Sequence, residues 1–300
     1  MIPFPVVGVA RPNFLILTPI CISLGLSSVL LSEHSVDWGL FAVVLLGALM
    51  AHISVNALNE YSDFHSGLDF KTDRTPFSGG SGTLVVQPRL APYALAIGVV
   101  SLLITLICGL YLLQQAGWGL IPIGFIGVLI ILTYTSWINR NRLLVLLAPG
   151  LGFGPLMVIG THYAMTAEYS STAFLLSMVP FFLVNNLLLL NQIPDVDADR
   201  SVGRDNYAIA WSPAKSAWLY LIFSILAYLV IVAGVVLGRL PMMALIGLVT
   251  GGLAYQNYQG VRVYTGDVKQ LIPYLGKNVI LTLVTPFLIF IGITLDLIVL

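Results

Sequence analysis

The chain has 300 residues, of which 58% are hydrophobic and only 9% are charged, and its formal net charge at pH 7 is zero. Soluble domains usually carry about 25% charged residues, so a water-soluble surface is excluded and lipid must be the main solvent of this chain. A neutral chain also lacks the basic surface that nucleic-acid binding requires, and we expect no such partner. Cys21 and Cys108 lie inside apolar runs without metal-ligand spacing, which indicates buried, reduced thiols.

Nine apolar stretches follow one another along the chain, each close to the roughly 20 residues that a helix needs to cross the hydrocarbon. They cover residues 13–31, 38–58, 91–113, 117–138, 144–166, 171–193, 216–238, 241–259 and 278–298. Their apolar residues are continuous rather than alternating, which favours helices. The sequence therefore predicts an all-α, polytopic membrane protein with nine transmembrane helices in one domain over residues 1–300. The first run follows no signal-peptide pattern, so it is expected to stay in the mature protein.

The basic residues are distributed unequally between the two sides of the predicted spans. If nine spans are placed, 12 of the 13 Lys and Arg residues fall on the side of the N-terminus, and Arg239 alone falls on the other side. Lys and Arg are enriched in cytoplasmic loops. We therefore expect an inner-membrane protein whose N-terminus and loops at 59–90 and 194–213 face the cytoplasm.

The second span runs into an acidic motif. Asn59 and Asp63 are four residues apart, and Asp69 follows six residues later. Residues i and i+4 share one face of a helix, so the first two side chains should be neighbours. Gly67 is expected to end the helix, which lets Asp69 turn back from the loop.

A second motif of the same kind follows the sixth span. Asn191 and Asp195 are again four residues apart, and Asp199 follows after four more. On one continuous helix these three side chains would form a row. Both motifs are predicted on the same side of the membrane, so the sequence places two acidic segments at one face.

Carboxylates crowded at a membrane boundary repel each other and are costly to desolvate, and a divalent cation removes both problems. Oxygen ligands without a suitably spaced Cys or His favour Mg²⁺. We therefore predict Mg²⁺ at Asp63, Asp69, Asp195 and Asp199, completed by water and substrate phosphate oxygens. A single Asp-x3-Asp pair more often marks solvated loop acids, but two paired segments at equivalent helix ends favour the metal.

The linker that precedes the third span holds two more candidates. Lys71 and Arg74 lead into a glycine-rich stretch, residues 78–82, which has no Walker pattern. The two cations could neutralise a phosphate, and the glycines permit close backbone approach. A plain flexible linker is the alternative interpretation.

These features resemble the UbiA superfamily of intramembrane prenyltransferases over essentially the whole chain. The resemblance lies in the nine spans, the Asn-rich first motif followed by Arg74-Thr-Pro76, and the second motif after the sixth span. The spacing from Asp63 to Asp69 and the string from Gly152 to Tyr163 are most similar to the 1,4-dihydroxy-2-naphthoate (MenA-like) branch. Two residues depart from the pattern: Glu60 stands where Asp is common, and Pro194 where Arg is common.

The resemblance implies a reaction. Mg²⁺ at the two motifs would offset the charge of a polyprenyl diphosphate, and the allylic cation would alkylate an aromatic acceptor. Asp63 and Asp195 would carry the catalytic metal cluster. Tyr134 stands at a family tyrosine position and would stabilise the cation, although an interfacial belt tyrosine is an equal alternative.

The same resemblance implies several substrate contacts. Asn59 and Asn191 would lie beside the diphosphate. Because Pro194 replaces a common arginine, one diphosphate contact is either missing or supplied by Arg200 or Arg204. Arg140 and Arg142 are candidates for binding a carboxylate on the acceptor, with membrane anchoring as the alternative.

Three alternative functions remain open at this stage. The acceptor could be 4-hydroxybenzoate or another aromatic compound, or the same site could belong to a prenyl-diphosphate cyclase. A divalent-cation or proton-coupled transporter is a third possibility, but its acids should lie near the bilayer midplane on broken helices. The prenyl chain length and the oligomeric state are not indicated by the sequence.

Overall fold

The computed structural model describes residues 4–211, 213–264 and 266–299, and every regular element within these ranges is a helix. The long segments, in chain order, are η1 (Phe4–Ala10), α1 (Pro12–Leu15) and α2 (Leu17–Leu31), α3 (Trp38–His65), α5 (Ala91–Ala116), α6 (Ile121–Thr133), α7 (Arg142–Leu151), η6 (Gly152–Leu156) and α8 (Met157–Thr166), α9 (Ser171–Asn191), α12 (Pro213–Val236), η7 (Met242–Thr250) and α13 (Gly251–Tyr264), and α14 (Val268–Val299). Short helices join them: η2 (Leu68–Phe70), α4 (Thr83–Val86), η3 (Pro88–Leu90), η4 (Trp118–Leu120), η5 (Ile138–Arg140), α10 (Val196–Ser201) and α11 (Tyr207–Ala210).

Six of the described helices are long and apolar enough to cross a membrane, or seven if the bent pair formed by 6–15 and 17–31 is one span. The predicted all-helical membrane fold is confirmed, whereas the number nine stays a prediction. Two predicted ranges account for the difference. The helix at 118–133 is short, and the segment at 242–264 starts as a 3-10 helix and continues as α13, which contains polar side chains.

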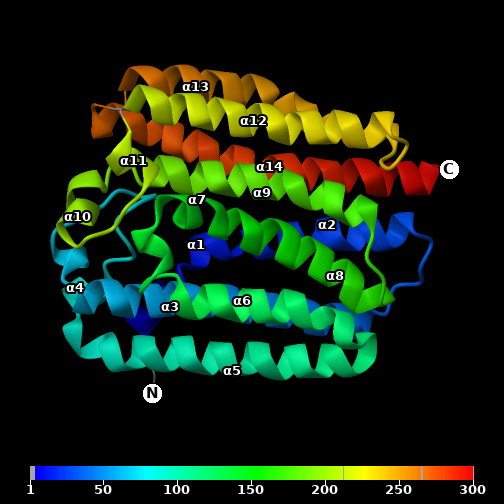
Figure 1. The fold of residues 1–300 in the computed structure, drawn as a ribbon, viewed down its shortest axis with the longest axis horizontal. Coiled ribbons are helices and arrows are strands. Elements are labelled where there is room, and N and C mark those ends of the chain that lie inside the picture. The colour runs from blue at the N-terminus through cyan, green and yellow to red at the C-terminus, as the bar shows by residue number, and fades with distance from the viewer. Residues whose placement is uncertain (1–3, 212, 265, 300) are drawn as a thin grey trace.

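The long helices run side by side along the longest axis of the molecule (Figure 1). The strongest contacts pair α3 with α5, α9 with α12, and α14 with η7. In this view α12, α13 and α14 form one side of the bundle, α3, α5 and α6 form the other, and α9, α2 and α7 to α8 lie between them. The short helices α4, α10 and α11 gather at one end.

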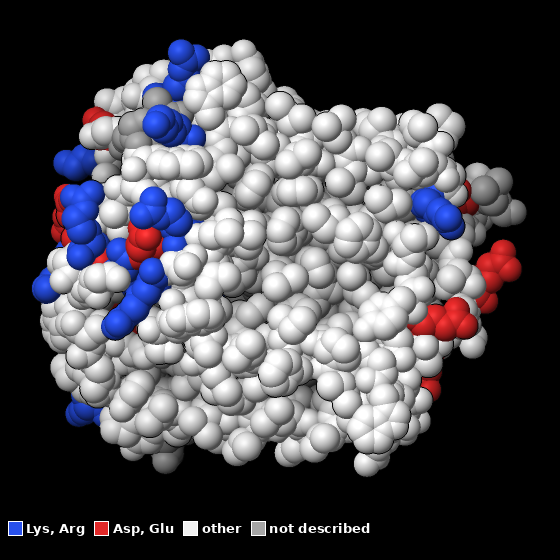
Figure 2. Space-filling view, viewed as in Figure 1, with Lys and Arg blue, Asp and Glu red and all other residues white. Residues whose placement is uncertain are grey.

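The surface of the bundle is divided by charge (Figure 2). Lys and Arg gather at the end where α10 and α11 lie, the opposite end is mainly acidic, and the surface between the two ends is almost free of charge. Large apolar side chains such as Leu103 and Ile107 of α5 and Phe125 of α6 are exposed on this middle zone. A broad exposed apolar surface of this kind suits contact with lipid.

Glycines let the fifth apolar segment approach α9 closely. A Cβ atom on Gly150 would lie 2.3 Å from the carbonyl oxygen of Phe181, and one on Gly154 would lie 2.4 Å from that of Ser177. The absence of a side chain at these two positions therefore allows the segment to pack closely against α9. Gly152, between them, has open space beside it and faces a cavity.

Candidate active site

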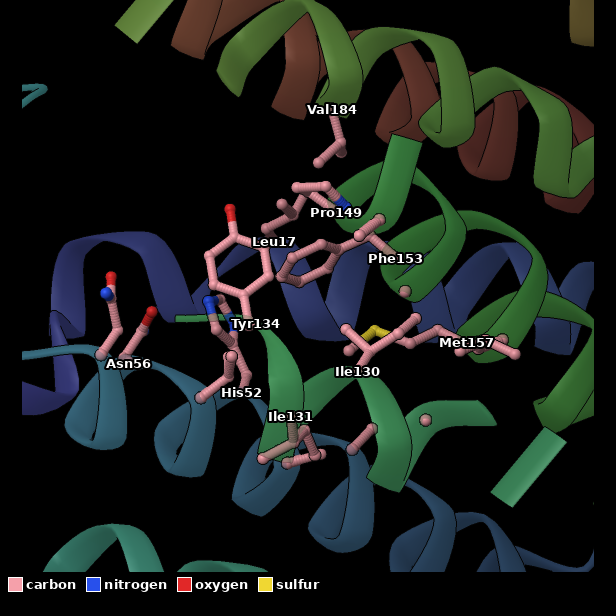
Figure 3. Close-up of a pocket in the computed structure, with 18 of the residues that line it drawn as sticks. Leu17, His52, Asn56, Ile130, Ile131, Tyr134, Pro149, Phe153, Met157 and Val184 are labelled. Atoms are coloured by element: carbon pink, nitrogen blue, oxygen red, sulfur yellow. The ribbon is translucent and has the colours of Figure 1, made fainter. Parts of the chain in front are cut away.

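A cavity of about 730 Å³ opens between α3, α5, α6, the α7–α8 segment and α9. Both acidic segments line its polar end, and apolar side chains line most of the remainder. Figure 3 shows this gradient, from Asn56 on α3 to Ile130 and Met157 at the apolar side. The cavity therefore joins a charged mouth to an apolar interior.

The first acidic segment has the geometry expected from its sequence. The Nδ2 atom of Asn59 donates to Oδ2 of Asp63 at 2.8 Å. Helix α3 ends at His65, and Gly67 adopts a φ of 76°, which glycine reaches without steric cost. Asp69 therefore turns back in η2, is only 5% exposed and lines the cavity.

The second acidic segment does not form the single helical row expected from the i, i+4 spacing. Helix α9 ends at Asn191, Asp195 stands at the N-cap position of α10, and Asp199 lies within α10. Pro194 explains the break, because it lacks a backbone N–H and disfavours helical geometry in the preceding residue. All three predicted side chains still line the cavity.

Arg204 joins the two segments. Its Nη2 atom donates to Oδ1 of Asp63, and its Nη1 atom donates to Oδ1 of Asp199 at 3.1 Å. Asn206 donates to the other oxygen of Asp199, also at 3.1 Å. The prediction that both segments lie at one face is thus confirmed.

The linker after η2 covers the same site. The backbone N–H of Gly79 donates to Oδ2 of Asp195 at 3.2 Å, while the backbone N–H and the hydroxyl of Ser81 donate to Glu60 at 2.6 and 2.8 Å. A Cβ atom on Gly80 would lie 3.0 Å from Oε1 of Glu60. The glycine-rich stretch therefore contacts both acidic segments, which a plain spacer would not do.

Sequence reasoning missed one ion pair of the site. The Nε and Nη2 atoms of Arg11 donate to Oε1 of Glu60 at 2.9 and 2.7 Å, Glu60 is fully buried, and Arg11 lines the cavity. A signal was available, because a buried glutamate needs a cation and Arg11 is the only Lys or Arg before Lys71. The left-handed backbone of Arg11, with a φ of 49°, has no sequence signature.

Two carboxylates of the site hold their protons unusually tightly. Burial, together with the nearby charges of Glu60 and Asp63, raises the pKa of Asp69 to about 7. Burial and the charge of Asp199 raise the pKa of Asp195 to about 7. Buried carboxylates that repel each other in this way are stabilised by a bound cation.

The residues fit a magnesium ion. Oδ2 of Asp69, Oδ1 of Asp195 and Oδ1 of Asn191 are buried and have no hydrogen-bond partner among the described residues. Such oxygen donors are the ligands that Mg²⁺ prefers, and Mg²⁺ takes one or two carboxylates and fills its remaining positions with water and phosphate. Among the described residues no group of three or more His, Cys, Asp or Glu side chains is placed to hold a metal ion, so water and phosphate oxygens would have to complete the coordination.

The other predicted contacts divide into two groups. Asn59, Tyr134 and Arg204 line the cavity. Lys71, Arg74, Arg140 and Arg200 are exposed and do not line it. Lys71 donates to the hydroxyl of Ser201 at 3.3 Å, Arg74 donates to the carbonyl of Gly79 at 3.3 Å, and Arg200 pairs with Asp197 at the surface. Their roles in substrate binding stay predictions.

Aromatic side chains line the cavity beyond the charged mouth. Tyr134 lies beside Phe153, Pro149 and His52 in the close-up view (Figure 3). The rings of His52 and Phe153 meet edge to face with centroids 4.7 Å apart, and Nδ1 of His52 is 2.9 Å from the hydroxyl of Thr18. His52 is thus held by packing and one hydrogen bond, and Tyr134 contributes an aromatic ring to the cavity wall.

Curated relatives share much of the chain. A 1,4-dihydroxy-2-naphthoate octaprenyltransferase from Bacillus subtilis (strain 168) is 29% identical over 210 residues, which are 68% of this chain and 65% of that protein, just under two thirds of its length. The protein of the same name from Mycobacterium tuberculosis is 27% identical over 245 residues, covering 81% of this chain and 80% of its own.

Solved structures share the fold of this chain, and a family model matches most of its length. A UbiA homologue from Archaeoglobus fulgidus bound to GPP and Mg²⁺ matches with a TM-score of 0.60 at 13% identity, covering 95% of this chain and 99% of its own. A digeranylgeranylglyceryl phosphate synthase matches with a TM-score of 0.66 at 13% identity, over 99% and 98% of the two chains. The model of the UbiA prenyltransferase family matches residues 18–271, and this chain belongs to that family.

Proposed function

We propose that this protein transfers a polyprenyl group from an allylic diphosphate to 1,4-dihydroxy-2-naphthoate, in a magnesium-dependent step of menaquinone biosynthesis. The observation that carries the proposal is the pair of acidic segments, with unpaired oxygens on Asp69 and Asp195, at the mouth of a mainly apolar cavity. Two naphthoate octaprenyltransferases among the relatives, and a neighbour of the same fold that binds GPP and Mg²⁺, support it.

Different residues of the cavity would serve the metal, the diphosphate and the organic part of the substrates. When bound, Mg²⁺ offsets the charge of the diphosphate and makes it a better leaving group. Asp63, Asp69, Asp195 and Asp199 would supply the carboxylates that hold the cation, and the amide of Gly79 and the guanidinium of Arg204 are donors at the same place. The allylic C–O bond breaks and the diphosphate takes the electron pair. The ring carbon that carries the acceptor's carboxylate forms the new C–C bond, and the carboxylate leaves as CO₂, which restores the aromatic ring.

The aromatic and apolar walls serve the organic part of the substrate. The faces of Tyr134 and Phe153 can stabilise the allylic cation, and an apolar interior keeps water away from it. Leu106 and Leu110 of α5, together with Phe125 of α6, line the cavity and are themselves exposed on the apolar surface. This part of the cavity suits an isoprenoid tail.

Removing the metal tests the proposed function directly. Purified protein supplied with a polyprenyl diphosphate, Mg²⁺ and dihydroxynaphthoate should form a prenylated product, identified by mass. An excess of chelator should abolish turnover, and added Mg²⁺ should restore it, because the leaving group is no longer neutralised without the cation. Undiminished turnover in chelator would contradict the metal assignment.

We further propose that the acidic end faces the cytoplasm in the inner membrane, since 12 of the 13 Lys and Arg residues are predicted on this side. The native Cys21 and Cys108 are buried and should contribute little background labelling. An impermeant thiol reagent applied to intact cells should therefore label Glu168→Cys, which lies at the opposite end, and should not label Lys71→Cys until the cells are opened. The reverse pattern would overturn the orientation.

A further inference from the structure

Arg204 fills the gap between the two acidic segments. One guanidinium donates to one oxygen of Asp63 and to one oxygen of Asp199. The side chains of Arg204, Asp63 and Asp199 are only 19%, 9% and 5% exposed. Charges buried to this degree are weakly screened by salt and water, so the contact holds the ends of α3 and α10 together.

The four carboxylates of the site are not equivalent. Both oxygens of Asp63 accept hydrogen bonds, one from Arg204 and one from Asn59, and both oxygens of Asp199 accept them from Arg204 and Asn206. Oδ2 of Asp69 and Oδ1 of Asp195, in contrast, have no partner among the described residues. Two of the four carboxylates, those of Asp63 and Asp199, are therefore already neutralised by Arg204.

A divalent cation cannot use the bridged oxygens while the guanidinium occupies them. Resting on the proposed metal–diphosphate site, we infer that Arg204 is a built-in counter-ion that competes with the divalent cation until a diphosphate draws its side chain away. A guanidinium forms paired hydrogen bonds with phosphate as readily as with carboxylate. Its transfer to the diphosphate releases Asp63 and Asp199 as metal ligands, so metal and diphosphate promote each other's binding.

The surroundings of Arg204 allow this exchange without a rearrangement of the fold. The next residue, Asp205, is fixed through its backbone N–H to the carbonyl of Asn139 at 3.0 Å, and Gly203 takes up the turn before it with a φ of 79°. A change of rotamer is then enough to move the guanidinium. The benefit is that two buried carboxylates never face each other without a cation.

The test measures metal binding in the absence of turnover, with Mn²⁺ as a spectroscopic probe and inorganic pyrophosphate as the diphosphate. Purified full-length protein should bind Mn²⁺ weakly alone and more tightly with pyrophosphate. The Arg204→Gln variant should bind Mn²⁺ alone about tenfold more tightly than the native protein, since a charged hydrogen-bonding competitor is removed, and pyrophosphate should add less. Arg204→Lys keeps the positive charge but replaces the two separate guanidinium nitrogens that contact Asp63 and Asp199 with one compact ammonium, and it should give an intermediate affinity.

Arg200→Gln is the matched control. Arg200 lies in the same segment and its loss changes the net charge equally, but it pairs only with the 99% exposed Asp197 and does not line the cavity. In the absence of pyrophosphate this variant should leave the Mn²⁺ affinity within about twofold of the native value, because exposed charges interact weakly. If Arg200→Gln and Arg204→Gln raised the Mn²⁺ affinity equally, the change in net charge alone would account for the effect, and the inference would be overturned.

The remaining outcomes separate the inference from the function on which it rests. If the native protein binds Mn²⁺ with pyrophosphate but Arg204→Gln binds Mn²⁺ alone no more tightly than the native protein, the competition is refuted and the proposed function stands. If no form binds Mn²⁺ under either condition, both fail. Should Arg204→Gln not fold, Arg204→Lys decides: a tighter Mn²⁺ site than in the native protein supports the competition, and an unchanged one refutes it.

Discussion

Asp63→Asn and Asp195→Asn should each lower turnover by a factor on the order of a hundred or more, because each removes one carboxylate from a single metal–diphosphate cluster. The two residues lie on different segments, at the end of α3 and at the start of α10, and both line the same cavity. The double variant should be little worse than either single variant, since residues that act as one unit have non-additive effects. Steady-state rates at limiting and saturating Mg²⁺ measure this.

Asp197→Asn provides the control from the same short helix. Its side chain is 99% exposed and is absent from the cavity wall, so its substitution should leave the rate within about twofold of the native value. Thermal unfolding of all variants in detergent separates a catalytic loss from a folding defect, which matters for Asp63 because its removal leaves Arg204 with one partner fewer. Near-native rates for both single variants at limiting Mg²⁺ would show that these carboxylates do not hold the metal.

The parts of the site that sequence reasoning predicted are those with a local pattern. The i, i+4 spacing of Asn59 and Asp63 carries over directly into a hydrogen bond, and the glycine at position 67 ends α3 as expected. The end of helix α9 at Asn191 could be predicted only in part from the sequence. The spacing from Asn191 to Asp195 and Asp199 is helical, but Pro194 removes a backbone donor and ends the helix, and the two effects could not be weighed without tertiary contacts.

The parts that were missed depend on contacts between residues far apart in the sequence. Arg11 and Glu60 are 49 residues apart, and Arg204 and Asp63 are 141 apart, so no periodicity connects them. The choice between Arg200 and Arg204 as the buried cation likewise depends on the turn at Gly203, which directs one into the cavity and leaves the other at the surface. A transporter, the alternative that needs acids near the bilayer midplane, is not favoured, because the carboxylates of the two acidic motifs lie together at one end of the bundle and the middle of its surface is almost free of charge.

The second large effect that we expect is a difference in prenylation rate between two aromatic acceptors. Offered equal amounts of 1,4-dihydroxy-2-naphthoate and 4-hydroxybenzoate with one prenyl diphosphate, the protein should prenylate the naphthoate at least about tenfold faster, as a site shaped for a flat, two-ring substrate gains contact area from the second ring. The spacing from Asp63 to Asp69 and the two naphthoate octaprenyltransferases among the relatives support this choice. Mass spectrometry of the products measures the ratio.

The fate of the carboxylate gives an independent readout of the same competition. When the new C–C bond forms at the ring carbon that carries the carboxylate, the carboxylate leaves as CO₂ and its bonding electrons restore the aromatic ring, whereas 4-hydroxybenzoate alkylated beside its hydroxyl loses a proton and keeps its carboxylate. Arg140 and Arg142 were expected to bind this group, but Arg140 is exposed and Arg142 pairs with Asp205 at 3.0 Å. Arg11 and Arg204 are the Lys or Arg side chains that line the described cavity, so Arg11→Gln should raise the KM for the naphthoate more than Arg142→Gln does. Faster prenylation of 4-hydroxybenzoate, with its carboxylate retained, would overturn the assigned acceptor and leave the diphosphate site intact.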